Sequence, residues 1–247
     1  MLKNSRIKKV YGYFLFVCIL GFLTFFHFQT NILNYVGEKI FLDYHFNNIA
    51  IFTLEKVSKK DFYTNFLLGR IYFVEGDQYK SIANYNLSIE KKSDFKQSYY
   101  GRGLTYGFMG SDFYPEAARD FQKYIDIDNQ EFEKTGNHAY GAWAGYNDLA
   151  WIYFMQGDFE KSEEAARNGL KIGNSAWLLN TLGTSLLAQK KCSDAKIYLQ
   201  LANDEMKKIS VEKFGEAYSG DNPNFWEAGK KQMEEAIVDN LKLCEEK

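Results

Sequence analysis

Proline, cysteine and histidine are all scarce in this sequence of 247 residues. Only two prolines occur. Proline breaks helix interiors because it lacks a backbone donor and clashes with the preceding turn, so its scarcity permits long helices. The three histidines, His27, His45 and His138, lie far apart and beside no cysteine or carboxylate cluster. Metal ligands must converge on one point, so we predict that the chain holds no metal and no other cofactor.

The signatures of common catalytic sites are also missing. The sequence contains no nucleophile-elbow serine, no phosphate-binding glycine loop and no dinucleotide fingerprint. Beyond residue 30 the chain holds 32 acidic and 26 basic side chains, and phosphate backbones would repel this excess of negative charge. We therefore predict that the protein is not an enzyme and binds no nucleic acid.

Charged side chains are absent from one long segment near the N-terminus. The 19 residues from Val10 to Phe28 include no Asp, Glu, Lys or Arg. As an α-helix this segment spans about 28 Å, close to the hydrocarbon thickness of a bilayer. A cleaved signal peptide is the main alternative, but it requires a shorter apolar run and small residues at its cleavage site. We predict an uncleaved transmembrane anchor over residues 10–28.

Basic residues flank this segment on one side only. Lys3, Arg6, Lys8 and Lys9 precede it, and the next basic residue is Lys39. The positive-inside rule places residues 1–9 in the cytoplasm and the rest of the chain on the extracytoplasmic side, in the periplasm if the anchor crosses a cell inner membrane. The alternative is a mitochondrial outer-membrane anchor with the domain facing the cytosol, because the sequence does not identify the membrane.

The rest of the chain repeats with a period near 34 residues. Small residues recur at Gly69, Gly103, Ala150 and Gly183, in steps of 34, 47 and 33 residues. Three positions later stand Tyr72, Tyr106, Tyr153 and Leu186, and glycines suited to a turn with positive φ follow at 76, 110 and 157. Apolar residues such as Ala117, Phe121 and Tyr124 have the spacing of one helix face. The long step contains a two-residue insertion and an extra stretch around 131–138.

These residues resemble the tetratricopeptide repeat (TPR), a helix pair of 34 residues. The resemblance implies an all-α fold, an α-solenoid with repeats over 62–95, 96–131, 143–175 and 176–209. Residues 31–61 carry Ala50, Leu54 and Val57 at the second-helix spacing, so we predict a degenerate TPR-like pair there. Residues 210–247 are predicted to hold a linker and a capping helix, whose apolar stripe consists of Trp226, Gly229, Met233, Ile237, Leu241 and Cys244.

In the TPR family the first helices of successive pairs line a concave groove that accepts a peptide or a partner helix. Carried over by position, the groove of this chain consists of Tyr63, Phe66, Arg70, Phe73, Tyr100, Leu104, Phe108, Asn147, Trp151, Phe154, Trp177, Asn180 and Thr184. For each aromatic the alternative is packing beneath the neighbouring pair. The family's chaperone-tail clamp is not predicted, because Gly101, Ala144 and Asp148 replace three of its residues.

The resemblance also implies a function in binding proteins. We predict a membrane-tethered adaptor or scaffold, whose groove binds a peptide or partner protein on the extracytoplasmic side and whose residues 10–28 contact the lipid bilayer. One alternative is a structural subunit of a larger membrane complex, which would use the convex face and the insertion over 128–142. Another is a domain that binds a glycan or peptidoglycan fragment in the aromatic groove.

Two cysteines lie outside the predicted anchor. Cys192 falls in the turn between the helices of the fourth repeat, and Cys244 lies near the end of the capping helix. If that helix stacks as the first helix of a fifth pair would, the two sulfurs could form a disulfide in an oxidising compartment. The alternative is that Cys244 is a small apolar filler and Cys192 an exposed thiol.

Overall fold

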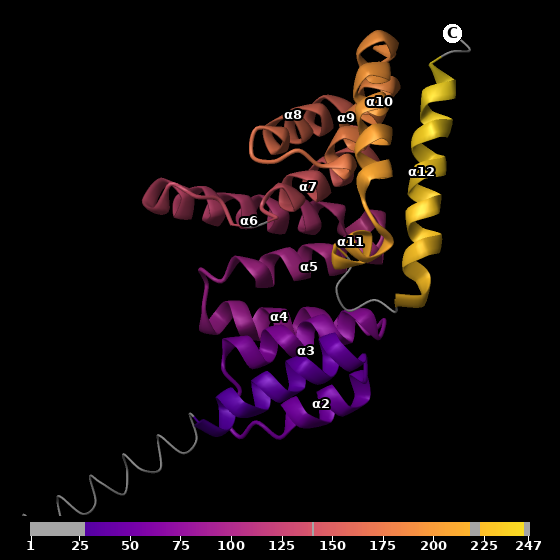
Figure 1. Cartoon of the computed structure of the whole chain (residues 1–247). Coiled ribbons are helices and arrows are strands. Elements are labelled where there is room, and N and C mark those ends of the chain that lie inside the picture. The colour runs from indigo at the N-terminus through magenta and orange to yellow at the C-terminus, as the bar shows by residue number, and fades with distance from the viewer. Residues whose placement is uncertain (1–27, 140, 218–222, 245–247) are drawn as a thin grey trace, which may run out of the picture.

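The computed structural model describes residues 28–139, 141–217 and 223–244, and all regular structure in these ranges is helical (Figure 1). The helix over residues 28–44 is followed by α2 (Asn47–Glu55), α3 (Phe62–Val74), α4 (Gln78–Lys91) and α5 (Lys96–Met109). A short 3-10 turn (Ser111–Phe113) leads into α6 (Tyr114–Thr135), and then come α7 (Trp143–Met155), α8 (Phe159–Leu170), α9 (Ala176–Ala188) and α10 (Cys192–Lys208). The chain ends with α11 (Val211–Glu216), a 3-10 turn (Pro223–Phe225) and α12 (Trp226–Leu243).

Successive helices form antiparallel pairs that stack in chain order, from the pair 28–44/α2 to the pair α9/α10 (Figure 1). Each pair packs on the next through its second helix, so α4 lies on α5, α6 on α7 and α8 on α9. The α-solenoid predicted from the sequence repeat is confirmed by this arrangement.

Close approach of the two helices in a pair depends on the repeated small residue. A Cβ added to Gly69 would lie 2.8 Å from the Tyr85 ring, and one added to Gly183 would lie 2.6 Å from Leu199. Atoms this close would overlap, so the second helix reaches its position only because the first carries no side chain there. The first pair makes the same contact, because a Cβ on Gly37 would lie 2.7 Å from Leu54.

Buried hydroxyl groups join neighbouring pairs. Ser81 donates to the Gly69 carbonyl at 2.9 Å and lies 3.0 Å from Thr105 Oγ1 on the next pair. Ser162 repeats this pattern, donating to the Ala150 carbonyl at 2.7 Å, and its oxygen lies 2.6 Å from Ser185 Oγ. A buried polar group costs free energy unless it is hydrogen-bonded, so these contacts favour one register between pairs.

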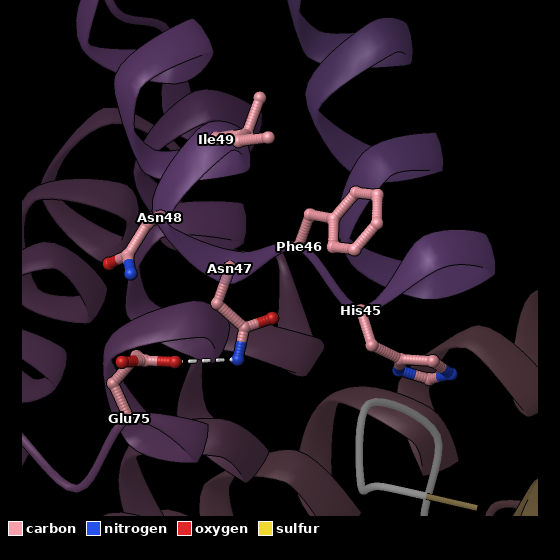
Figure 2. Close-up of a pocket in the computed structure, with 6 residues that line it drawn as sticks. All are labelled: His45, Phe46, Asn47, Asn48, Ile49 and Glu75. Carbon is pink, nitrogen blue, oxygen red and sulfur yellow. Dashed lines mark hydrogen bonds between the residues drawn. The ribbon is translucent and has the colours of Figure 1, made fainter.

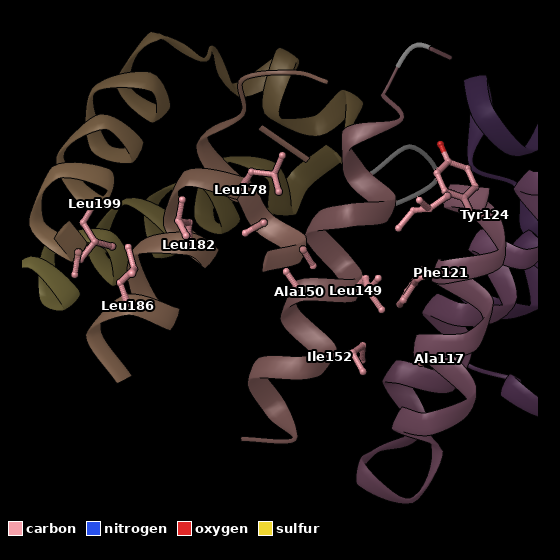
Figure 3. Close-up of a cluster of buried hydrophobic side chains, with 14 residues drawn as sticks. Ala117, Phe121, Tyr124, Leu149, Ala150, Ile152, Leu178, Leu182, Leu186 and Leu199 are labelled. Atoms are coloured by element: carbon pink, nitrogen blue, oxygen red, sulfur yellow. The ribbon is translucent and has the colours of Figure 1, made fainter. Parts of the chain in front are cut away.

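The largest apolar cluster runs through the second half of the solenoid (Figure 3). Leu178, Leu182 and Leu186 of α9 and Leu199 of α10 are buried beside the apolar faces of α6, α7 and α8. At the C-terminal end α12 packs on α10, with Ile237 fully buried and Met233 and Leu241 against the same clusters. The apolar stripe of α12 therefore covers the end of the core, as a capping helix does.

Residues 10–27 of the predicted anchor lie outside the described residues. Within the part of the chain that the structure describes, no helix combines the length and the apolar character needed to cross a bilayer.

Candidate functional site

The 13 predicted groove residues lie on the first helices α3, α5, α7 and α9, each of which contacts the next one along the stack. Two of them are well exposed: Phe108, at 74%, and Trp151, at 44%. Phe66, Asn180 and Thr184 are buried. The others are partly buried, namely Tyr63, Arg70, Phe73, Tyr100, Leu104, Asn147, Phe154 and Trp177.

Exposed and half-buried apolar side chains gather at the last turns of three consecutive first helices. Phe73 of α3 packs edge-on against Phe108 of α5, with ring centroids 5.2 Å apart. On α7, Trp151 stacks on Phe154 at 5.4 Å, and Met155 is 46% exposed beside them. We name these five residues the aromatic ridge. Aromatic and methionine side chains exposed together are typical of protein-binding surfaces.

Met155 was missing from the predicted groove. It follows the repeated small residue Ala150 by five positions, just as Phe108 follows Gly103. This matching position is a sequence signal that could have found it.

A polar network connects three first helices beside the ridge. Tyr100 of α5 donates its hydroxyl to Asp148 Oδ2 at 2.7 Å. Asn147 donates to the other carboxylate oxygen of Asp148 at 3.1 Å, and Thr181 of α9 donates to Asn147 Oδ1 at 3.0 Å. The network therefore ties α5, α7 and α9 together through side chains alone.

Burial raises the pKa of Asp148 to about 6, although the bonds from Tyr100 and Asn147 oppose this rise. Between the ordinary carboxyl pKa and this value, the folded chain holds a proton that the unfolded chain has lost. The free energy of unfolding should therefore fall as the pH rises through this window, reaching its full loss above about pH 6.

Asp148→Asn cannot ionise, so we expect this variant to gain stability relative to the wild type as the pH rises. Urea unfolding followed by circular dichroism at about pH 4 and pH 7 measures the difference. Parallel behaviour of the two proteins at both pH values would show that Asp148 is not the titrating group.

Three of the partly buried groove residues pack against side chains of other helices. Trp177 stacks between Trp143, at 6.0 Å, and Phe214 of α11, at 5.6 Å, so α11 closes this end of the surface. Tyr63 donates its hydroxyl to Glu38 of the first pair at 2.6 Å. The Arg70 guanidinium lies over the rings of Phe41 and Phe66, at 5.4 and 5.7 Å.

The insertion after the second repeat is held by buried charges. Asp128, which is 1% exposed, accepts from Lys96 Nζ at 2.6 Å and from the Ala139 backbone at 3.2 Å, and its other oxygen lies 2.7 Å from His138 Nδ1. Glu131 also pairs with Lys96. Burial alone would raise the pKa of Asp128, but the bonds from Lys96 and His138 hold it below its ordinary value.

An open hollow of about 350 Å³ lies at the turn of the first pair (Figure 2). His45, Phe46, Asn47, Asn48 and Ile49 line it together with Glu75 at the end of α3, and Asn47 donates to Glu75 at 2.7 Å. None of these residues belongs to the predicted groove, and the few polar groups are partly satisfied by one another. We assign no ligand to this hollow.

Cys192 and Cys244 are not joined in the described part of the chain. Cys244 packs, with Leu241, against the apolar cluster that includes Ala195 at the start of α10. The predicted proximity of the two cysteines is therefore compatible with this packing, and the disulfide stays a prediction for an oxidising compartment.

No protein-family profile and no curated protein match this sequence, whereas many solved structures do. PilW, described as a widely conserved type IV pilus biogenesis factor, aligns over 85% of this chain and 90% of its own, with a TM-score of 0.60 and 13% identity. MamA aligns over 70% of this chain and 95% of its own, with a TM-score of 0.59 and 18% identity. A thermophilic TPR protein from Thermus thermophilus aligns over 77% and 98%, with a TM-score of 0.54 and 11% identity. At such identities the likeness shows the fold, which is that of TPR solenoids.

Proposed function

We propose that this protein is a membrane-tethered, non-enzymatic adaptor whose aromatic ridge binds a partner protein. The observation that carries the proposal is the exposure of Phe108 and Met155 at matching positions of successive first helices, together with the exposure of Trp151 one turn before Met155 on α7. Monomeric soluble proteins rarely expose contiguous apolar patches of this kind without a binding role. The fold supports the same function, because TPR-type solenoids present extended concave surfaces to partners.

The tether of this proposal is the charge-free segment over residues 10–28. Its basic flank supports a cytoplasmic N-terminus and a repeat domain on the extracytoplasmic side. The adaptor would then collect a protein or peptide partner at the outer face of the membrane.

Removing the two most exposed rings of the ridge should weaken partner binding. We expect Phe108→Ala with Trp151→Ala to lower affinity by about tenfold or more, because exposed aromatics at the centre of an interface carry much of its binding energy. The partner is first identified by crosslinking in native membranes and mass spectrometry, and its affinity is then measured by titration calorimetry.

Tyr79→Ala is the matched control, because Tyr79 is also a highly exposed aromatic but lies on the second helix α4. It should leave the affinity unchanged. Equal losses in the control and in the ridge variant, or loss of helical circular dichroism in the ridge variant, would remove the ridge as the binding surface.

A structural subunit of a larger complex is the second candidate function, and the shape of α6 favours it. The C-terminal end of α6 projects beyond the neighbouring pairs (Figure 1), and Phe132 near this end is exposed. This function predicts a partner that copurifies with the protein at constant stoichiometry. Phe132→Ser should release that partner, and Phe108→Ala should not.

A further inference from the structure

The first helix pair has an apolar outer face. On the helix over residues 28–44, Thr30, Asn34 and Phe41 point into the solenoid and are buried. The opposite side of the same helix and of α2 presents apolar side chains that remain exposed in the described chain: Phe28, Ile32, Tyr35, Val36, Ile49 and Phe52. Figure 1 shows α2 at the end of the stack, so this face looks away from the other pairs.

These side chains form one surface and are not scattered singly. Phe28, Ile32, Tyr35 and Val36 follow one another at steps of four, three and one residue, the spacing of a single helix face. The contact between Gly37 and Leu54 places the C-terminal end of α2 beside the middle of this helix. Because the two helices are antiparallel, Phe52 lies about one helical turn beyond Val36, near the level of Lys39. Single exposed apolar residues are ordinary, whereas a contiguous patch marks a surface that something covers.

Lysines border the patch at the end where the described chain begins. Ser58 donates to Gln29 Oε1 at 3.3 Å, which places the residues after α2 beside the first turn of the helix over 28–44. Lys56 Nζ lies 4.8 Å above the Phe52 ring, and Lys59 is exposed nearby. Lys60 pairs with Glu55, at 2.9 Å, so the acidic side chain on this border is neutralised. Exposed lysines beside aromatic rings suit the anionic headgroups of a membrane surface.

The connection of this helix to the proposed anchor favours a bilayer, over other partners, as the surface that covers the apolar face. Phe28 is the last residue of the charge-free segment over residues 10–28, which the proposed function places in the membrane. At 1.5 Å per residue, Ile32 lies within about 6 Å of Phe28 along the helix, and Val36 within about 12 Å. If the anchor spans the bilayer, the apolar face of the first pair begins at the bilayer surface.

We propose that the first helix pair lies flat on the membrane, with its outer face in the headgroup region and the solenoid standing away from the bilayer. A helix that buries apolar and aromatic side chains in the interface while lysines contact headgroups has the character of an interfacial amphipathic helix. The Lys39–Asp43 pair, at 3.2 Å, lies farther along the same face and remains compatible with this position, because both side chains can reach the aqueous layer. This inference rests on the anchor of the proposed function.

The test uses the full chain, inserted into vesicles of phosphatidylcholine and phosphatidylglycerol. Cys18, Cys192 and Cys244 are replaced by serine, and one environment-sensitive fluorophore is attached to Ile32→Cys, Ile49→Cys or, as the control, Tyr79→Cys. Tyr79 is more exposed than either test residue but lies on α4, away from the first pair's outer face. Lipids that carry a nitroxide near the headgroup should quench the labels at 32 and 49 about threefold or more relative to the label at 79.

Alkaline carbonate extraction of the same vesicles tests the anchor separately. Release of the protein into the supernatant would overturn the anchor of the proposed function and this inference with it. Retention of the protein with equal, weak quenching at all three labels would overturn the inference alone. Quenching at 32 without quenching at 49 would show that the pair stands upright, which also overturns it. If the labels are shielded from aqueous iodide but are not quenched by the lipids, the inference is also overturned. The face would then be covered by a second copy of the chain.

Discussion

Replacing Tyr85 with alanine is expected to lower the free energy of unfolding by about 3–5 kcal/mol, the usual cost of deleting a buried aromatic ring. Tyr85 of α4 is 1% exposed, and its ring fills the space between α3 and α5. The ring fits there because both facing residues are glycines: a Cβ would lie 2.8 Å from it at Gly69 and 2.4 Å at Gly101. Urea unfolding followed by circular dichroism measures the loss.

A double-mutant cycle tests whether the glycines and the ring depend on each other. Gly101→Ala should cost about 1–3 kcal/mol in the wild type through overpacking, and much less when Tyr85→Leu has removed the outer part of the ring. Gly107→Ala on the same helix is the matched control, because its Cβ would meet Ile152 at an ordinary 3.4 Å. It should be neutral or slightly stabilising, since alanine favours helix interiors. Equal costs at the two glycines would show that helix propensity, and not contact with Tyr85, governs Gly101.

Replacing Asp128 with alanine is expected to destabilise the protein by about 3–5 kcal/mol, because it breaks a buried ion pair from one side. Lys96, only 4% exposed, would keep Glu131 as its single carboxylate partner. The backbone of Ala139 and the ring of His138 would also lose their acceptor, so the insertion after α6 should open. Thermal unfolding gives the stability change, and amide exchange over residues 131–139 reports the opening.

Two comparisons separate the buried pair from surface charge. Lys96→Met with Asp128→Leu should recover much of the loss, since no charge then remains buried without its partner. Asp239→Ala removes the exposed partner of Lys242 and should leave the unfolding midpoint nearly unchanged. Because the pKa of Asp128 is lowered in the folded chain, this carboxylate adds to the free energy of unfolding above the ordinary carboxyl pKa. The added stability disappears as the pH falls below that ordinary pKa. A loss in the Asp128 variant no greater than in the Asp239 variant would contradict the proposed role.

The sequence alone determined the repeat fold, because the two residues that make the contact inside each helix pair are separated by a nearly constant number of residues. Gly69 meets Tyr85 and Gly183 meets Leu199, each pair 16 residues apart, so small and large residues at these steps predict which helices pack together. The same logic extends to Gly37 and Leu54, although the prediction for residues 31–61 rested on the second helix only. Such contacts are local in sequence, and their signal survives without any knowledge of neighbouring repeats.

Only the tertiary structure decided which groove residues are available to a partner. Trp151 and Trp177 were predicted alike from helix position, yet Trp151 is exposed while Phe214 of α11 stacks on Trp177. Lys96 and Asp128 are 32 residues apart, and neither belongs to a motif that predicts their pairing. The position of a residue in a helix determines the face on which its side chain lies. What covers that face depends on segments distant in sequence, and only their packing decides whether an aromatic side chain is core or binding surface.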